Sequence, residues 1–220
     1  SILLTHGNKT IMKDIKLSVV NAKNNSIKKT LRKWVNKAME DPDVWKSGLD
    51  WYEEAQKFVE FVSKQYKIDS YIVACVLAIL SPNNKWDRNK VDCIALIHAY
   101  IQGGAIAAML VKVCTYSANK IKAIKVLDGM IELSTKSPKT HSFAMNVGLN
   151  SPEHITIDKW HIRACICSPK DGIVDVVESC TAAQYRRIEA LTSEIAKEYH
   201  LKGYQVQAII WVMIKKTWKR

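Results

Sequence analysis

The stretch LSTKSPKTHSFAMN spans residues 133–146, and ITIDKWHIR follows it at residues 155–163. Each stretch predicts the start of a helix, because Pro138 suits a first helical turn and Asp158 suits an N-cap position. Lys139 and Asp158, nineteen positions apart, therefore open two consecutive helices. An amine and a carboxylate placed in this way can attack or stabilise a sugar C1′ while a base departs. Taken alone, each residue also has a structural explanation, as a solvated lysine and a helix cap.

Helical periodicity runs through almost the whole chain and convincing alternating strands are absent, which predicts an all-α fold. Residues 1–26 are polar and predict a loosely attached leader. Gly103-Gly104 and Gly203 mark breaks, and Thr181 to Gln184 resembles a capping box. Helices are expected over residues 27–39, 45–66, 71–80, 87–101, 105–113, 118–130, 139–148, 158–167, 181–199 and 204–218.

The chain is strongly basic, with 33 Lys+Arg against 21 Asp+Glu and a formal net charge of +12. Such a surplus steers a protein toward polyanions, so we expect double-stranded DNA as a partner. The six cysteines fit apolar helical patterns, and Cys165-Ile-Cys167 has no second close pair to complete a zinc site. The longest apolar run, near residues 206–214, is too short to span a bilayer. No targeting segment opens the chain, so we expect a reduced cytosolic protein without metal or membrane.

Four stretches together resemble the helix-hairpin-helix DNA glycosylase superfamily, most closely its endonuclease-III-like branch. In that family a helix leads into a hairpin of pattern LPGVGxKTA, and VDTHxxR follows one helix later. In this chain, residues 116–124 resemble the helix that leads into the hairpin. Lys139-Thr140 matches the end of the hairpin pattern, and residues 155–163 match the second motif. Upstream, Leu80-Ser81 and Asn89-Lys90 look like the family's LLSxQ…NK segment. The resemblance covers roughly residues 70–165.

The resemblance implies an all-α fold of two helical lobes with a central cleft and a helix-hairpin-helix motif. A six-helix barrel lobe would span residues 70–141 and end in that motif. Residues 27–69 and 142–220 would form a second, discontinuous helical lobe, preceded by the polar leader.

The resemblance also implies roles for individual residues. Lys139 falls on the Schiff-base lysine of the bifunctional members, and Asp158 on the carboxylate shared by nearly all members. Asn83 or Asn84 falls near the polar finger that fills the gap left by an extruded base. The remaining expectations are a substrate pocket containing Trp86 and His141, and DNA contacts from Lys136, Ser137, Thr140, His161 and Arg163.

Three departures from the family pattern stand out. The two hairpin glycines are replaced by Thr135 and Ser137, so DNA docking there is weaker or differently arranged. Lys-Trp-His follows the aspartate where the family has Thr-His, which places His161 one position late. The four-cysteine iron–sulfur loop is missing, and we expect no cofactor.

Two further features have structural explanations. The stripe Tyr204, Ala208, Trp211 and Ile214 is typical of core packing. The lysines at 120, 122 and 125 and the basic tail at 215–220 predict solvated faces that could border a DNA track.

The resemblance implies a DNA glycosylase, with or without AP lyase activity, that excises a modified or mismatched base after base flipping, as in DNA repair. We expect a monomer in the cytoplasm of a bacterium or a phage-infected cell, or associated with the nucleoid. One alternative is a phage-type enzyme that modifies thymine-like bases on the same scaffold. Another is a non-catalytic DNA-binding protein, which charge alone does not distinguish from an enzyme.

Overall fold

The computed structural model describes residues 17–171 and 176–218, and these residues confirm the all-α prediction. Their regular structure is helical apart from one isolated bridge between Leu17 and Val176. In chain order the elements are η1 (Val19–Asn21), α1 (Asn24–Met39), α2 (Pro42–Tyr66), α3 (Ser70–Leu80), α4 (Trp86–Leu110), α5 (Ser117–Leu127), α6 (Pro138–Gly148), α7 (Lys159–Ile166), α8 (Ala182–Glu198) and α9 (Gly203–Thr217).

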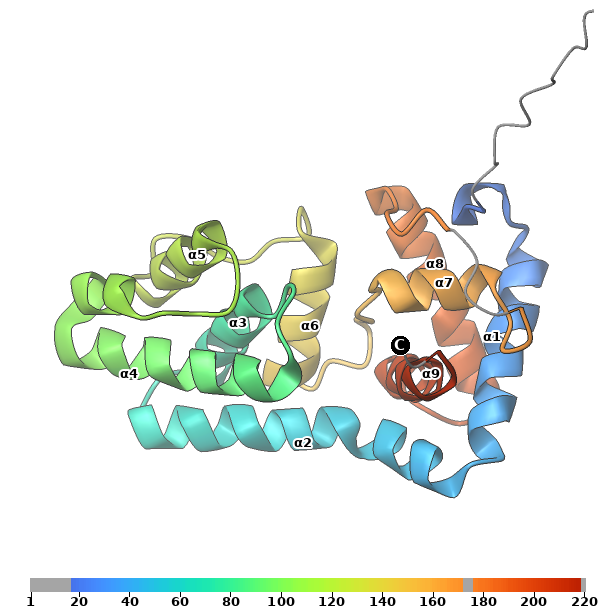
Figure 1. Ribbon diagram of the computed structural model, residues 1–220, viewed down its shortest axis with the longest axis horizontal. Helices are drawn as coiled ribbons and strands as arrows, with labels where there is room; N and C mark the ends of the chain where they lie inside the picture. The colour runs from blue at the N-terminus through green and yellow to red at the C-terminus, as the bar shows by residue number, and fades with distance from the viewer. Residues whose placement is uncertain (1–16, 172–175, 219–220) are drawn as a thin grey trace, which may run out of the picture.

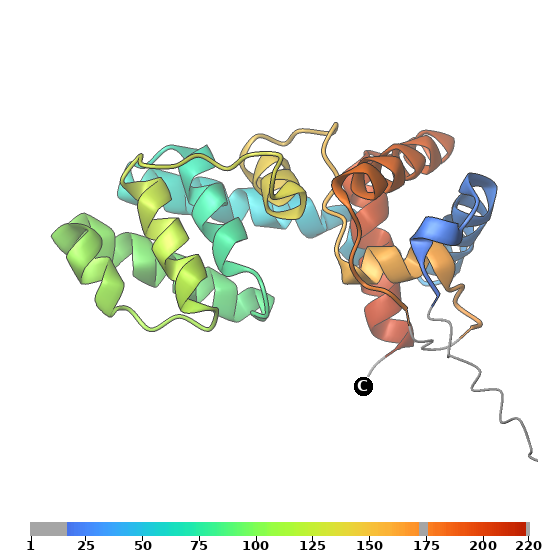
Figure 2. The same cartoon turned by 90° about the horizontal axis from the view of Figure 1, so that it is seen from above.

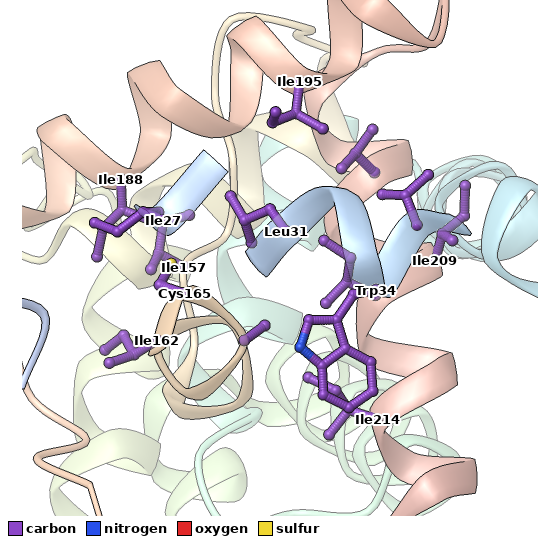
Figure 3. Packing of buried hydrophobic residues seen from close by; sticks show 14 of the residues in the cluster. Ile27, Leu31, Trp34, Ile157, Ile162, Cys165, Ile188, Ile195, Ile209 and Ile214 are labelled. Carbon is purple, nitrogen blue, oxygen red and sulfur yellow. The ribbon is translucent and has the colours of Figure 1, made fainter. Parts of the chain in front are cut away.

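Two hydrophobic cores divide the described chain into two lobes (Figures 1 and 2). The first lobe is built from α1, α7, α8 and α9, with Val44 at the start of α2. Figure 3 shows its packing, in which Leu31 and Trp34 of α1 lie among isoleucines of α8 and α9. The second lobe is built from α3, α4, α5 and α6, and the later part of α2. Burial of these apolar side chains supplies most of the driving force for the fold.

Helices α2 and α9 join the lobes. The 25 residues of α2 extend for about 37 Å at the usual helical rise, under both lobes in Figure 1. Tyr204 and Ala208 of α9 complete the second core, while the rest of the buried face of α9 belongs to the first. The two helices pack so closely that a Cβ added to Gly48 would lie 2.5 Å from Ile209 Cα. Glycine at position 48 therefore permits the close approach of α2 to α9.

The predicted domain boundaries need three corrections. Val19 is buried in the first core and α1 already begins at Asn24, so residues 17–26 are not a loose leader. Residues 1–16 lie outside the described residues. Phe143 and Val147 of α6 pack in the second core, not in the first, because α6 lies against α3. The later part of α2 likewise belongs to the second core.

Local signals explain most helix ends. The predicted helix over 118–130 stops at Leu127 because Gly129 takes a positive φ of 68° and Met130 N–H bonds back to the Lys125 carbonyl. The expected capping box at Thr181 is present at the start of α8. The break expected at Gly103-Gly104 is present, because both glycines have non-helical backbone and α4 consists of two helical segments that meet there at a kink. The predicted hairpin partners, α5 and α6, flank α3 and each packs on it (Figure 1).

One described helix, α4, has the length and apolar composition of a membrane span, with a mean hydropathy of 1.7 over its most apolar window. Core helices of soluble proteins also have these properties, and Cys93, Leu96 and Ile97 of α4 pack in the second core. The run at 206–214, by contrast, lies within α9 and bridges the lobes.

Candidate active site

A cavity of about 840 Å³ lies between the two lobes, and both Lys139 and Asp158 line it. Its wall comes from α2, the 81–85 loop with the start of α4, the start of α6, residues 156–160, residues 178–180, and α9. Residues of both cores therefore meet in one concave surface. The structure brings together the amine and the carboxylate that the sequence places at the starts of consecutive helices.

Asp158 is the N-cap of α7, as predicted. Its Oδ1 accepts a hydrogen bond of 2.8 Å from the backbone N–H of His161. The segment before it is held by Tyr185, whose hydroxyl accepts from Ile157 N at 3.0 Å and donates to the Ile155 carbonyl at 2.7 Å. Because Ile155 and Ile157 are themselves buried, the chain delivers the Asp158 carboxyl to the cavity at a defined place.

Burial raises the pKa of Asp158 above its ordinary value. The backbone N–H of His161, the charge of Lys139, the backbone N–H of Trp160 and the charge of Lys215 all lower that pKa, but they do not offset the desolvation. The backbone N–H groups at the N-cap position therefore favour the ionised carboxylate, but desolvation outweighs them and the net shift of the Asp158 pKa is upward. Lys139 and Lys215 both lie close enough to act electrostatically on the carboxyl.

Lys139 follows Pro138 at the start of α6, and its side chain is exposed at the cavity. Pro138 occupies the first turn as predicted. Within the described part of the chain, no carboxylate forms an ion pair with this lysine. Its amine is therefore available to a ligand that enters the cavity.

Aromatic side chains form much of the cavity wall. The ring of Trp51 on α2 lies 5.1 Å from Trp86, 6.0 Å from Phe143 and 6.1 Å from Trp211, measured between centroids. Trp86, predicted as a pocket residue, does line the cavity and also packs against the second core. Half-buried rings grouped in this way can stack on a planar ligand.

The 81–85 loop is fixed on both sides. Buried Asp92 accepts hydrogen bonds from the Asn84 amide at 2.9 Å, from Arg88 at 2.7 Å and from Cys114 N at 2.7 Å. The Nδ2 of Asn84 is thus held by Asp92, and the side chain is half-buried in the cavity wall instead of exposed. Asn83 remains exposed at a positive φ of 56° and donates to the Tyr116 hydroxyl.

Two histidines do not take the predicted positions. His161 is buried and its Nε2 lies 2.8 Å from Thr192 Oγ1 of α8, so it has no access to DNA. Burial also lowers the pKa of His161 to about 4, so the ring is neutral at pH 7. His141 lies outside the cavity wall and packs against the ring of His154, 5.2 Å away. Both side chains occupy the faces of α7 and α6 that point away from the cavity.

The remaining predicted DNA contacts fall into two groups. Ser137 and Thr140 line the cavity beside Lys139, whereas Lys136 is exposed outside it. Arg163 forms an ion pair with Glu178, with 2.7 Å from Nε to Oε1. This ion pair engages the Arg163 guanidinium with an acidic side chain of the protein itself.

Several cavity residues were not predicted as part of a site. Tyr52 and Gln207 are buried and meet in the wall, and Trp211 and Lys215 of α9 line the same cavity. The periodic stripe that contains Trp211 predicted core packing, and Lys215 was assigned to a solvated tail. The spacing of Trp211 and Lys215 could have identified both residues. They lie four positions apart on the last helix, near the edge of its apolar stripe, so they share one face.

Comparison with known proteins identifies a family to which the chain is similar over almost its whole length. The model of a family of unknown function, DUF7178, matches residues 14–218. No curated protein and no solved structure matches the chain.

Proposed function

We propose that this chain, which belongs to the family of unknown function DUF7178, is a DNA N-glycosylase with AP lyase activity. The observation that carries the proposal is the presence of Lys139 and Asp158 in the wall of one cavity between two lobes. A nucleophilic amine and a carboxylate are the two groups that release of a base through a Schiff base requires.

The walls of the cavity support a flipped nucleotide as the ligand. Trp51, Trp86 and Trp211 offer faces on which a base can stack. Lys85, Lys139, Lys159 and Lys215 line the same cavity and suit a phosphate backbone. Extruding a base costs on the order of a few kcal/mol, which stacking on these rings helps to offset.

The proposed reaction begins with the neutral amine of Lys139 attacking C1′ of the flipped nucleotide. The C1′–N bond breaks, and its electron pair leaves with the base, which takes up a proton. The Asp158 carboxylate stabilises the positive charge on the sugar and accepts a proton from the attacking nitrogen. The proton on Asp158 passes to O4′ as the ring opens, which gives an iminium ion. Water then takes a C2′ proton, the 3′ phosphate leaves with the electron pair of the C3′–O bond, and hydrolysis of the iminium ion by a second water releases the enzyme.

The structure of the 81–85 loop favours Asn83 over Asn84 as the residue that fills the space left in the duplex. Asn83 is exposed, while the Asn84 amide is held by Asp92. Asp92 and Thr115, which donates to the Pro82 carbonyl at 3.0 Å, would keep the loop rigid during insertion.

Borohydride trapping on abasic-site DNA tests the proposal. We expect the wild-type protein to form a covalent adduct and Lys139→Ala to form none. Lys136→Ala is the matched control, because this exposed lysine precedes the same helix but lies outside the cavity wall. If wild type traps no better than Lys139→Ala, the lyase assignment is wrong. Asp158→Asn should slow base release more than it weakens DNA binding.

A second candidate is modification of a thymine-like base on the same scaffold. The volume of about 840 Å³ lies toward the upper end of the range for small-ligand pockets, which leaves room for a base with an extended substituent. Mass spectrometry of nucleosides after incubation with ordinary and hypermodified DNA separates the two. Free base and abasic sites support excision, a new nucleoside supports modification, and salt-sensitive binding without product indicates a non-catalytic protein.

A further inference from the structure

Lys215 of α9 is held between two indole rings at the cavity. Its Nζ lies 4.6 Å from the ring centroid of Trp160 and 5.6 Å from that of Trp211. Trp211 is one turn earlier on the same helix, and Trp160 comes from the first turn of α7. Two cation–π contacts restrict the ammonium group to a small region. The Lys215 side chain, which would otherwise be flexible, is thereby held in place before a ligand binds.

Lys216, the next residue along α9, differs from Lys215 in its contacts. Lys216 forms an ion pair with Asp41 on the first lobe. For Lys215, the described ranges 17–171 and 176–218 contain no carboxylate in an ion pair with it. Lys215 lines the cavity, Lys216 does not, and the charge of Lys215 reaches Asp158. Lys216 is therefore paired with a residue of the first lobe, whereas Lys215 faces the candidate active site.

A second ammonium group shares the same indole. Lys159 Nζ lies 5.4 Å from the ring centroid of Trp160 and also lines the cavity. Arg163 approaches this ring as well, at 5.8 Å, but its guanidinium is paired with Glu178. Both ammonium groups lie near the same indole ring and line the same cavity, so an anion bound there would interact with both charges. The arrangement therefore favours a ligand with concentrated negative charge.

We propose that Lys215 and Lys159 bind the phosphodiester next to the everted nucleotide, with the Trp160 ring positioning both amines. This inference rests on the proposed function. A lysine ammonium binds phosphate as a point charge, whereas the uncharged base suits the aromatic wall around Trp51. In the lyase step the same contact stabilises the phosphate that leaves C3′. Lys215 then acts on the sugar–phosphate backbone, and Lys139 on C1′.

The test measures equilibrium binding to duplex DNA that contains a tetrahydrofuran abasic-site analogue, so that no bond is cleaved. We expect Lys215→Met to weaken binding about tenfold, as for loss of one charge-assisted contact. The slope of log K against log salt should fall by about one. Lys216→Met, the adjacent lysine with its own carboxylate partner, should weaken binding less than about twofold.

Methylphosphonate substitution locates the contact. Neutralising each phosphate near the analogue in turn should weaken binding by the wild type at one position and leave Lys215→Met unchanged there. Equal losses for Lys215→Met and Lys216→Met, or a phosphate effect that persists in Lys215→Met, would overturn the inference.

Two outcomes separate this inference from the proposed function. A protein that shows the Lys215-dependent phosphate contact but releases no base overturns the enzymatic proposal alone. A protein that traps abasic DNA but shows equal losses in the two lysine variants overturns the phosphate site alone. Inorganic phosphate and a mononucleotide serve as competitors. If either binds at the Lys215 site more tightly than the duplex does, a free phosphate compound is the ligand and the phosphodiester assignment is wrong.

Discussion

The hydroxyl of Tyr52 on α2 donates a 2.8 Å hydrogen bond to the side-chain carbonyl of Gln207 on α9. Both side chains are buried and both line the cavity. Since α2 and α9 are the helices that join the two lobes, this bond holds the lobes together at the wall of the candidate active site. Burial raises the pKa of Tyr52, so the phenol remains a donor throughout the physiological range.

Replacing Tyr52 by phenylalanine should destabilise the protein by about 1–3 kcal/mol, because the Gln207 carbonyl loses its donor while it stays buried. Urea unfolding measures the change. Tyr100→Phe is the control, since the Tyr100 hydroxyl donates to Asp128 at the surface, where water can replace it. Similar losses in the two variants would show that the buried bond does not stabilise the junction of the lobes.

Gly48→Ala should destabilise the protein by about 1–3 kcal/mol through overpacking. The new methyl group would lie 2.5 Å from Ile209 Cα, and neither backbone can move without shifting a whole helix. Ser47→Ala, at the exposed neighbouring position, should be neutral or slightly stabilising. Thermal unfolding of the two variants distinguishes a steric effect from a general change in helix propensity.

Asp158→Asn should stabilise the fold at pH 7, because the raised pKa shows that ionised Asp158 is disfavoured in the folded protein. Asparagine keeps the N-cap acceptor. A group with a raised folded pKa contributes stability below its unfolded pKa of about 3.9, and this contribution is lost as the pH rises through the folded value. The advantage of Asp158→Asn in melting temperature should therefore shrink as the pH falls toward 4. A lower melting temperature at pH 7 would contradict this reasoning.

The pH dependence of base release should show an acid limb above the pKa of a free aspartate, if ionised Asp158 is needed for the proposed reaction. Lys215→Met should move this limb to higher pH, because the charge of Lys215 lowers the pKa of Asp158. Single-turnover rates at saturating enzyme exclude effects on DNA binding. Lys216→Met, whose partner is Asp41, should leave the limb in place.

Trp211→Leu should weaken binding to a duplex with an unpaired base by about 1–3 kcal/mol, the usual contribution of one stacked base. The measurement uses the Asp158→Asn background, in which turnover is slow. Trp45→Leu is the matched control, because this half-buried tryptophan packs against the first core and does not line the cavity. Equal effects would mean that loss of packing, not loss of stacking, weakens binding.

Helices could be located from sequence because their signals are local. Apolar residues three and four positions apart, Asp69 and Asp158 as N-caps, and Pro138 in a first turn all act within one or two turns. The errors were local too, as at α5, where the left-handed Gly129 ends the helix three residues earlier than periodicity suggested. His161 shows what local signals do not predict. Its position one turn after Asp158 on the same helix follows from the sequence, but its side chain faces Thr192 of α8.

The sequence by itself determined the helices, the basic charge and the placing of Lys139 and Asp158 at two helix starts. Only the tertiary structure decided which side chains share the cavity with them. Tyr52, Trp211 and Lys215 reach it because α2 and α9 cross between the lobes, a contact between residues more than 150 positions apart. The same packing removes water from Asp158. The resulting desolvation raises the pKa of Asp158, although the N-cap hydrogen bond alone would lower it. Desolvation depends on everything that surrounds a group, and periodicity along one helix carries no information about it.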